Sequence, residues 1–311
     1  MYKRIIGLIE KYETIIIHRH KNPDGDALGS QLGIKRLIEL NYPSKRVYAV
    51  GDENVFAFLG KMDIIDDDIY NNALVIILDV SVSRLVSDDR YKLANHVIII
   101  DHHLNPADIG DTVYINSEYI ACAEIVCDIA IKNNWKLDSA GATSLFTGIV
   151  TDSGRFLYPH TLSNTFKTAA YLIDNGADIQ GVYDKLYTVK LNYTKLKGYF
   201  LNNFKTTKNN VAYMKNDLSI KNKYGVSTFT VSRAMVNQMS GMEGINIWAN
   251  FTMDEDNIVQ VELRSKKISI VHIARKYGGG GHELACGCTL SSFEEADLVL
   301  NDLDELLEME R

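Results

Sequence analysis

Residues 96–103 read HVIIIDHH, an uninterrupted apolar run that stops at one aspartate and two histidines. A second run, ALVIILD at residues 73–79, stops at an aspartate in the same way. Apolar runs this short and this rich in valine and isoleucine are typical of strands buried on both faces of a parallel sheet. These two stretches therefore predict an α/β fold whose strands deliver polar side chains to one edge of the sheet.

The rest of the chain divides into two α/β parts. In the first part we expect further strands at 14–18 and 46–50, and helices at 28–40, 139–150 and 163–175. A polar stretch rich in lysine and asparagine follows. We predict an N-terminal domain with a parallel sheet over residues 1–185, a linker over 186–210 and a smaller α/β domain over 211–311.

The smaller domain has strand and helix patterns in a different order. Strands are predicted at 211–215, 245–253 and 258–264, and helices at 232–239 and 269–277. The second of these helices runs directly into four glycines and a histidine, GGGGH at 278–282.

Composition narrows the class of protein. The 311 residues are 46% hydrophobic and 23% charged, as in soluble globular proteins, and no apolar run approaches the roughly 20 residues of a membrane-spanning helix. The net charge of −7 argues against binding to long duplex nucleic acid. Cys122, Cys127, Cys286 and Cys288 form no C-x-x-C pair. We therefore expect these cysteines to pack in the core and the protein to be cytoplasmic, with no membrane partner.

Acidic and imidazole side chains follow four separate segments, where ligands of open parallel sheets usually bind. These side chains are His20, Asp24 and Asp26 after the strand at 14–18, Asp79 after 73–78, Asp101, His102 and His103 after 97–100, and Asp152 at the end of the helix at 139–150. So many carboxylates in one place repel each other unless cations neutralise them. We therefore expect two divalent ions about 3.5–4 Å apart, bridged by an aspartate. Mixed aspartate and histidine ligands favour manganese over magnesium.

Each signal also has a structural interpretation. An aspartate after a strand, such as Asp79, is most often a helix cap or turn residue. The sequence Asp24-Gly25-Asp26 alone fits a turn followed by a cap, and Asp152 alone fits a helix end. Four such signals in chain order favour a shared site.

Five motifs together resemble a known family. HRHKNPDGDALGS (18–30), ILD (77–79), DHH (101–103) and TDSGRF (151–156) resemble the DHH phosphoesterase superfamily, and LRSKKISIVHIARKYGGGGHELACG (263–287) resembles its DHHA1 domain. At this length the combination is similar to the nanoRNase A type, the bacterial bifunctional oligoribonucleases and pAp phosphatases. The resemblance covers essentially the whole chain.

The resemblance implies a role for each residue of the first domain's motifs. One ion would be bound by His20, Asp24 and Asp79, and the other by Asp26, Asp79, His102 and Asp152. Asp79 and His103 would be the catalytic residues, with His103 facing the substrate phosphate. Asp101 would orient a histidine. Asn22 and Arg84 lie close to these motifs in the sequence, and we expect them to support the site or to be purely structural.

The second domain would bind the substrate. A glycine after a helix often only caps the helix, and one glycine suffices for a cap. Four glycines allow a ligand to approach the backbone closely and allow the backbone amides to form an anion-binding concavity. Arg264 offers a forked guanidinium to a terminal phosphate, with a surface salt bridge as the alternative. The resemblance implies that substrate is bound by His103, Arg264, Ser265, Gly280, Gly281 and His282. Phe156 and Tyr158 fit either base stacking or packing.

The resemblance implies a metal-dependent phosphodiesterase, an exoribonuclease that degrades very short oligoribonucleotides, including pApA and pGpG, to mononucleotides and removes the 3′ phosphate of pAp. Its partners would be short RNA and pAp, with a homodimer left open. Three alternatives remain: a phosphodiesterase devoted to dinucleotide signals, a pyrophosphatase or exopolyphosphatase, and a non-catalytic nucleotide sensor. The GGGGH ending is not expected of a pyrophosphatase, and a sensor would have lost metal ligands.

Overall fold

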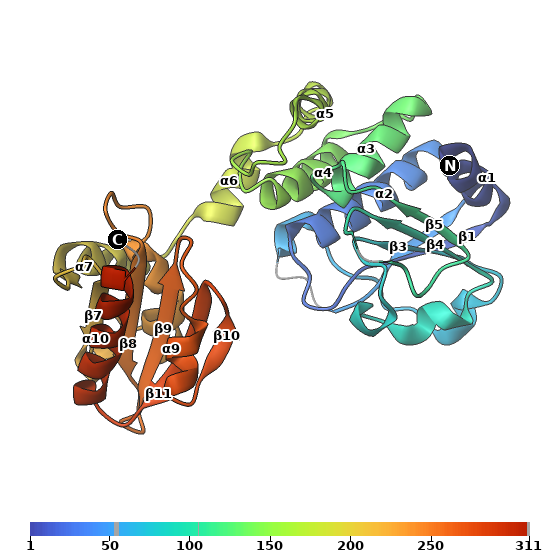
Figure 1. Ribbon diagram of the computed structural model, residues 1–311. Helices are drawn as coiled ribbons and strands as arrows, with labels where there is room; N and C mark the ends of the chain where they lie inside the picture. The colour runs from blue at the N-terminus through green and yellow to red at the C-terminus, as the bar shows by residue number, and fades with distance from the viewer. Residues whose placement is uncertain (53–55, 105, 310–311) are drawn as a thin grey trace. The chain divides into compact units, whose positions relative to one another are not determined.

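The computed structural model describes residues 1–52, 56–104 and 106–309, and the chain forms two compact units, Met1–Thr188 and Val189–Arg311 (Figure 1). Each unit has its own sheet and its own hydrophobic core. Within the described ranges, no helix is long and apolar enough to cross a membrane.

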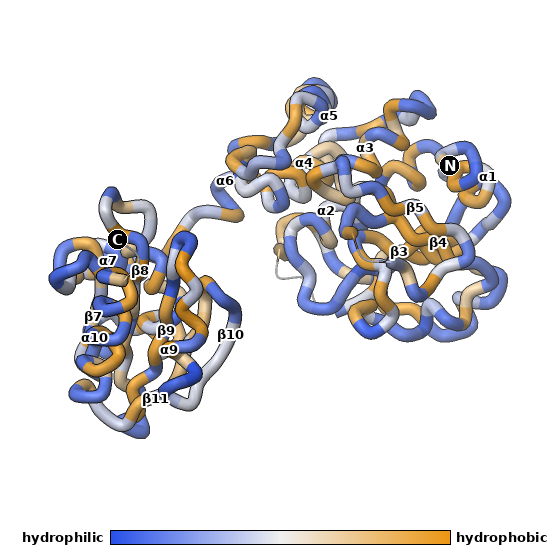
Figure 2. Tube along the Cα trace, viewed as in Figure 1, coloured by the Kyte–Doolittle hydropathy of each residue, from blue (hydrophilic) through white to orange (hydrophobic). Residues whose placement is uncertain are grey.

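The first unit is built on a five-stranded sheet in the order β2-β1-β3-β4-β5. Every neighbouring pair of strands is parallel. The strands are β1 (Thr14–His18), β2 (Arg46–Ala49), β3 (Leu74–Leu78), β4 (His96–Asp101) and β5 (Thr112–Ile115). All residues of β1 and β3 are buried, as their apolar runs predict, and Figure 2 shows the apolar colouring along β3 and β4.

Helices cover one face of this sheet and short 3₁₀ turns cover the other. The helices on that side are α1 (Tyr2–Lys11), α2 (Gly25–Asn41), α3 (Cys122–Lys132), α4 (Ser139–Asp152), α5 (Ser163–Asp174) and α6 (Ile179–Tyr187), of which α5 packs on α3 and α4, and α6 on α4, rather than on the strands. Ile15, Ile76 and Ile98 pack beneath the helices, whereas Ile16 and Ile77 pack with the 3₁₀ turns on the opposite face. Alternate residues of each strand thus enter two different cores.

Glycines in α2 allow it to lie very close to α4. A Cβ atom on Gly29 would come within 2.4 Å of the Ser144 carbonyl oxygen, and one on Gly33 within 2.5 Å of the Leu145 side chain. This close contact brings the first turn of α2 beside the last turn of α4. These are the turns that carry Asp24, Asp26 and Asp152.

The second unit contains a six-stranded sheet in the order β10-β11-β9-β8-β7-β6. Only β7 and β8 run parallel, and the other neighbours are antiparallel. The strands are β6 (Lys205–Thr206), β7 (Ala212–Asn216), β8 (Ile247–Met253), β9 (Val259–Ser265), β10 (Gly280–His282) and β11 (Ala285–Leu290).

Two sets of helices cover the faces of the second sheet. One face packs on α9 (Val271–Lys276) and α10 (Phe293–Met309), through residues such as Val261 and Leu303. The other packs on α7 (Leu191–Asn203), α8 (Leu218–Tyr224) and the turns that follow, around Trp248. The parallel sheet of the first unit and the smaller α/β second unit confirm the predicted fold class.

Two segments differ from the expectations. The stretch at 186–210 is predicted as a linker with a helix as one option, and most of it is indeed α7 and β6, but Leu196 and Phe200 of α7 are fully buried in the second unit. The helix predicted at 232–239 is a π-helical turn, Thr230–Ala234, followed by a 3₁₀ turn, Val236–Met239. All four cysteines are free and buried, as expected.

Candidate metal centre and phosphate-binding residues

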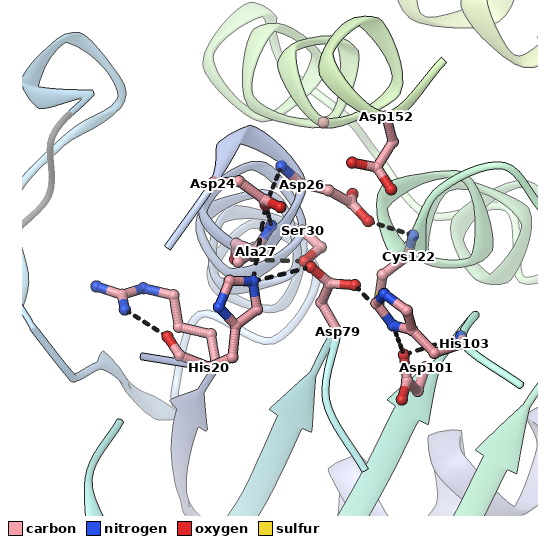
Figure 3. Close-up of polar contacts among 12 residues, drawn as sticks. His20, Asp24, Asp26, Ala27, Ser30, Asp79, Asp101, His103, Cys122 and Asp152 are labelled. Atoms are coloured by element: carbon pink, nitrogen blue, oxygen red, sulfur yellow. Dashed lines mark hydrogen bonds and ion pairs between the residues drawn. The ribbon is translucent and has the colours of Figure 1, made fainter. Parts of the chain in front are cut away.

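The six predicted metal ligands lie together at the carboxyl-terminal edge of the first sheet, and Figure 3 labels His20, Asp24, Asp26, Asp79 and Asp152 among them. His20 lies just beyond β1, Asp79 just beyond β3 and His102 just beyond β4. Asp24 caps the first turn of α2, where its carboxylate accepts hydrogen bonds from the Asp26 and Ala27 amides, and Asp152 is the last residue of α4.

His20 stands between two of these carboxylates. Its Nε2 atom is 3.4 Å from Asp79 Oδ2 and 3.8 Å from Asp24 Oδ1. Its Nδ1 atom lies 2.7 Å from the Lys21 carbonyl oxygen. Because a carbonyl only accepts, Nδ1 carries the proton, and Nε2 is presented to the carboxylates as a metal ligand requires.

His102 is the centre of a second group. Its Nε2 atom is 3.2 Å from Asp152 Oδ2, 3.3 Å from Asp79 Oδ1 and 3.7 Å from Asp26 Oδ2. Asp79 therefore lies between the two groups, with one oxygen toward His20 and the other toward His102.

The donor set fits divalent cations. His20, Asp24 and Asp79 present ligand atoms within 4.8 Å of one another, and so do Asp26, His102 and Asp152. Asp79 Oδ1 and His102 Nε2 are buried 3.3 Å from each other, yet neither makes a hydrogen bond to any residue that the structure describes. Buried polar atoms without partners are rare and require an explanation, and ions bound between these groups would supply one.

Asp26 is fixed by a helix terminus rather than by a side chain. Its carboxylate is fully buried and accepts hydrogen bonds from the first two amides of α3, Cys122 N at 2.6 Å and Ala123 N at 2.9 Å. Free amides at a helix N-terminus favour negative charge. Residue types carry no signature of this contact, because its donors are backbone amides.

The electrostatics reflect crowded negative charge. Burial, followed by the charges of Asp79 and Asp152, raises the pKa of Asp26 well above its usual value. Burial alone would lower the pKa of His102, but contacts with Asp152 and Asp79 outweigh it and raise this pKa to about 11. Burial also opposes protonation of His20, but Asp24 and Asp79 raise its pKa to about 10. Protons thus neutralise the carboxylates here, a role that metal ions can take over.

His103 differs from the six. Its side chain is about half exposed, and its Nδ1 lies 2.8 Å from Asp101 Oδ1. Nδ1 is also 3.6 Å from Asp79 Oδ1, which groups His103 with Asp79 and His102 as a third potential ligand set. Since the Asp101 carboxylate accepts the Nδ1 proton, this nitrogen is not free to bind a metal. The other ring nitrogen remains for a substrate.

A pocket of about 290 Å³ is lined by five residues of this cluster, His20, Asp24, Asp79, Asp101 and His103, and also by Lys21 and Ser81. A larger hollow of about 550 Å³ lies among residues of α2, α4 and α6. Its Lys35 is paired with Asp63 and its Arg36 with Asp138. No histidine lines that hollow, so the chemistry points to the smaller pocket.

The chain matches the DHH family, N-terminal domain, over residues 14–149 and the DHHA1 domain over residues 218–309. It is 36% identical to the bifunctional oligoribonuclease and PAP phosphatase NrnA of Bacillus subtilis (strain 168), over 98% of both chains. The chain belongs to the DHH family.

Other relatives of this DHH protein agree. The bifunctional oligoribonuclease and PAP phosphatase NrnA of Mycoplasma pneumoniae is 35% identical, over 96% of this chain and 94% of its own. Among solved structures, an exopolyphosphatase-related protein from Bacteroides fragilis has a TM-score of 0.74 at 24% identity and covers 99% of this chain and 97% of its own. That likeness shows a shared fold.

In the DHHA1 domain, Arg264 lies on β9 and is held by its own sheet. Its Nη2 atom is 2.8 Å from Glu262 Oε2, and its Nη1 donates to the Leu263 carbonyl oxygen at 2.8 Å. The alternative role of Arg264, a salt bridge, is therefore present, and its partner is Glu262. Arg264 Nε makes no hydrogen bond to the described residues, so the Nε edge of the guanidinium keeps one free donor. Ser265 is buried, and its hydroxyl accepts from the Ile268 amide.

The glycine run combines a helix end with a short strand. Gly278 N and Gly279 N donate to carbonyls at the end of α9, and residues 280–282 form β10. A Cβ atom on Gly279 would lie 2.1 Å from the Gly287 carbonyl oxygen, so packing alone excludes a side chain there. A Cβ atom on Gly280 would meet nothing within 4 Å, so Gly280 leaves open space beside the sheet. His282 is exposed on the same strand.

The remaining candidates lie outside the cluster. Phe156 stacks on Phe166 with ring centroids 5.4 Å apart, which favours packing, whereas Tyr158 is 57% exposed. The Asn22 amide donates to Asp52 Oδ2 at 3.4 Å. Arg84 contributes its carbonyl oxygen, which accepts from Lys21 Nζ at 3.1 Å.

Proposed function

We propose that this protein is a metal-dependent phosphodiesterase that degrades very short oligoribonucleotides to mononucleotides and removes the 3′ phosphate of pAp. The observation that carries the proposal is Asp79, whose two oxygens face two separate histidine-centred groups. A carboxylate shared in this way is the arrangement of two-ion phosphoryl-transfer sites. Membership of the DHH family, with near full-length relatives named as oligoribonucleases and PAP phosphatases, supports the substrate class.

Two divalent ions, which we propose to be Mn²⁺, would be bound by the six ligands and would supply an activated water and charge neutralisation at the phosphoryl group. Other groups of the protein hold the ligands and the substrate-binding side chains in position. The α3 amides fix the Asp26 carboxylate. Asp101 holds the His103 ring so that its free nitrogen can contact a phosphoryl oxygen of the substrate, stabilising the charge that develops there.

The DHHA1 domain would bind the end of the substrate. We assign a terminal phosphate to the open Nε edge of Arg264, with Ser265, Gly280, Gly281 and His282 around it. A guanidinium that its own strand already orients loses little freedom when it binds a phosphate. The net charge of −7 favours short substrates over long duplexes. Four free, buried cysteines support a reducing, cytoplasmic location.

The test is turnover of a substrate panel by the Mn²⁺-loaded protein: pApA, pGpG, a longer RNA, pAp and pyrophosphate. The proposal expects hydrolysis of both dinucleotides and of pAp, slower turnover of the longer RNA, and no activity after chelation. Hydrolysis of pyrophosphate alone would assign the protein to phosphatases of another substrate class. Turnover of pGpG at least about a hundredfold above pApA and pAp would favour a phosphodiesterase devoted to a dinucleotide signal.

A further inference from the structure

A second pocket adjoins the phosphate-binding residues of the DHHA1 domain. It has a volume of about 400 Å³ and is lined by Phe229, Ser232, Arg233, Gln260 and Glu262, among others. One wall is the π-helical turn Thr230–Ala234 and the other is β9. Glu262 belongs both to this wall and to the ion pair with Arg264, so the pocket and the proposed phosphate site are contiguous.

Glu262 has an unused oxygen. Its Oε2 accepts from Arg264, whereas Oε1 makes no hydrogen bond to any residue in the described ranges. A carboxylate beside an arginine weakens the binding of a bare phosphate, because the like charges repel. The same carboxylate favours a ligand that brings a hydroxyl donor together with its phosphate, since hydrogen bonds to charged groups are the stronger ones. A phosphorylated ribonucleoside is such a ligand.

Small residues leave space beside this pair. In the register of the sheet, Glu262 lies opposite Gly287, and Gly287 lies opposite Gly280. Arg264 lies opposite Ala285. On the side of β11 and β10, the row beside Glu262 therefore carries only glycines, and His282, which lies opposite Ala285, is in the same row as Arg264.

Phe229 supplies an aromatic surface. It lies immediately before the π-helical turn, and its side chain is 63% exposed although it is large and apolar. Exposed aromatic rings at the edge of polar pockets are typical stacking surfaces for nucleobases. Packing within the fold does not account for this ring, because Phe229 is not among the residues of the described hydrophobic cores.

We propose that this pocket binds the terminal nucleoside of the substrate, with Phe229 stacking on the base and Glu262 Oε1 accepting a hydrogen bond from a ribose hydroxyl. The inference rests on the proposed function, since Arg264 must hold the phosphate of the same nucleotide. Phe229 and Glu262 would then determine the specificity for a substrate whose terminal nucleotide is a phosphorylated ribonucleoside.

The experiment measures kcat and KM of the full-length, Mn²⁺-loaded protein on three substrates: pApA, pApA with a 2′-deoxyribose in the phosphorylated nucleotide, and pApA with an abasic ribose there. The wild type is expected to prefer pApA by roughly tenfold in KM over each analogue. Phe229→Leu should abolish the preference over the abasic analogue, and Phe229→Tyr should keep it. Glu262→Ala should abolish the preference over the deoxyribose analogue, and Glu262→Gln, which keeps an acceptor oxygen, should retain part of it.

Leu298→Ala is the matched control, because it also removes an exposed apolar side chain, 55% exposed, from the same unit. Equal effects of Phe229→Leu or Glu262→Ala on all three substrates would overturn the inference. Arg264→Ala separates it from the proposed function. If Arg264→Ala leaves the preference for pApA over unphosphorylated ApA unchanged, the phosphate assignment fails. Arg264→Ala could instead lose the preference for pApA over ApA while Phe229→Leu and Glu262→Ala still discriminate against the abasic and deoxyribose analogues. In that case the phosphate assignment holds and only the assignment of the nucleoside pocket is wrong.

Discussion

At the scale of single residues, Asp79 combines an unusual backbone conformation with the proposed role of a ligand shared by two ions. Its φ of +60° lies in the left-handed region, which asparagine and aspartate adopt more readily than other side chains. Asp79 N donates to the Ile100 carbonyl oxygen at 3.0 Å, which ties this turn to the end of β4. The turn therefore directs the carboxylate between His20 and His102 instead of along the strand.

This geometry gives the first prediction. Asp79→Asn should fold like the wild type, because asparagine tolerates the same φ and fills the same volume. It should nevertheless lose at least about a hundredfold in activity on both pApA and pAp, since one charge shared by two ion sites is removed. Thermal unfolding, calorimetric Mn²⁺ titration and turnover check this, with the exposed Asp174→Asn as control. An Asp79→Asn protein with wild-type Mn²⁺ binding and turnover would contradict the assignment.

At the scale of secondary-structure elements, the start of α3 determines how Asp26 is held. Cys122 is the first residue of the helix, where proline is tolerated, and the preceding Ala121 has the extended conformation (φ −149°, ψ 149°) that proline requires of its neighbour. Cys122→Pro should therefore retain α3 while removing the amide that bonds Asp26 Oδ2.

We expect Cys122→Pro to weaken Mn²⁺ binding by about 10–100-fold. Cys122→Ala keeps the amide and should bind Mn²⁺ like the wild type. Circular dichroism verifies the helix content, and calorimetric titration measures the affinity. Equal Mn²⁺ affinity of the two folded variants would show that the helix terminus does not control the site.

Gly279 and Gly280, two neighbouring glycines at the start of β10, allow a second comparison of matched variants. Gly279→Ala should destabilise the protein by about 1–3 kcal/mol, because the new methyl group overlaps the Gly287 carbonyl oxygen. Gly280→Ala meets no neighbour and should leave the melting temperature unchanged or slightly higher. If substrate approaches this strand, Gly280→Ala should raise KM for pApA several-fold. Unchanged KM in a stable Gly280→Ala protein would remove Gly280 from the proposed site.

The sequence predicts the elements that carry a clear pattern and misses those that do not. β1 and β3 were found within one residue, because strands buried on both faces are continuous apolar runs. Their polar ends led to the six clustered side chains. β5, α1 and the amides at the start of α3 were missed. The regular spacing of Gly25, Gly29 and Gly33 was a usable signal for the close contact of α2 with α4. The Glu262–Arg264 pair needed the register of β9, since both side chains lie on one face of the strand.

At the scale of the whole molecule, the chain contains two separate hydrophobic cores, and α7 belongs to the second. A fragment of residues 189–311 should therefore unfold cooperatively by itself. A fragment of residues 211–311, which begins at the predicted domain start, should be much less stable. It lacks the buried Leu196 and Phe200, each contributing about 1.5–3 kcal/mol.

Thermal melts of the two fragments followed by circular dichroism make this comparison. A double variant of the longer fragment, Leu196→Ala with Phe200→Ala, distinguishes loss of packing from loss of helix length. If residues 211–311 melt at the same temperature as residues 189–311, α7 is a connector rather than part of the core.

The left-handed turn at Asp79 also limits how this enzyme class can be re-engineered. A designer who wants a different ion preference would first exchange the shared ligand for glutamate or histidine. Glutamate carries a bulkier side chain into a conformation that costs roughly 1–2 kcal/mol for ordinary residues. Histidine adopts this conformation more readily, but it is also larger than aspartate. Asp152, at the last turn of an ordinary α-helix, carries no such backbone restriction. Attempts to retune the ions should therefore begin at Asp152 and leave Asp79 unaltered.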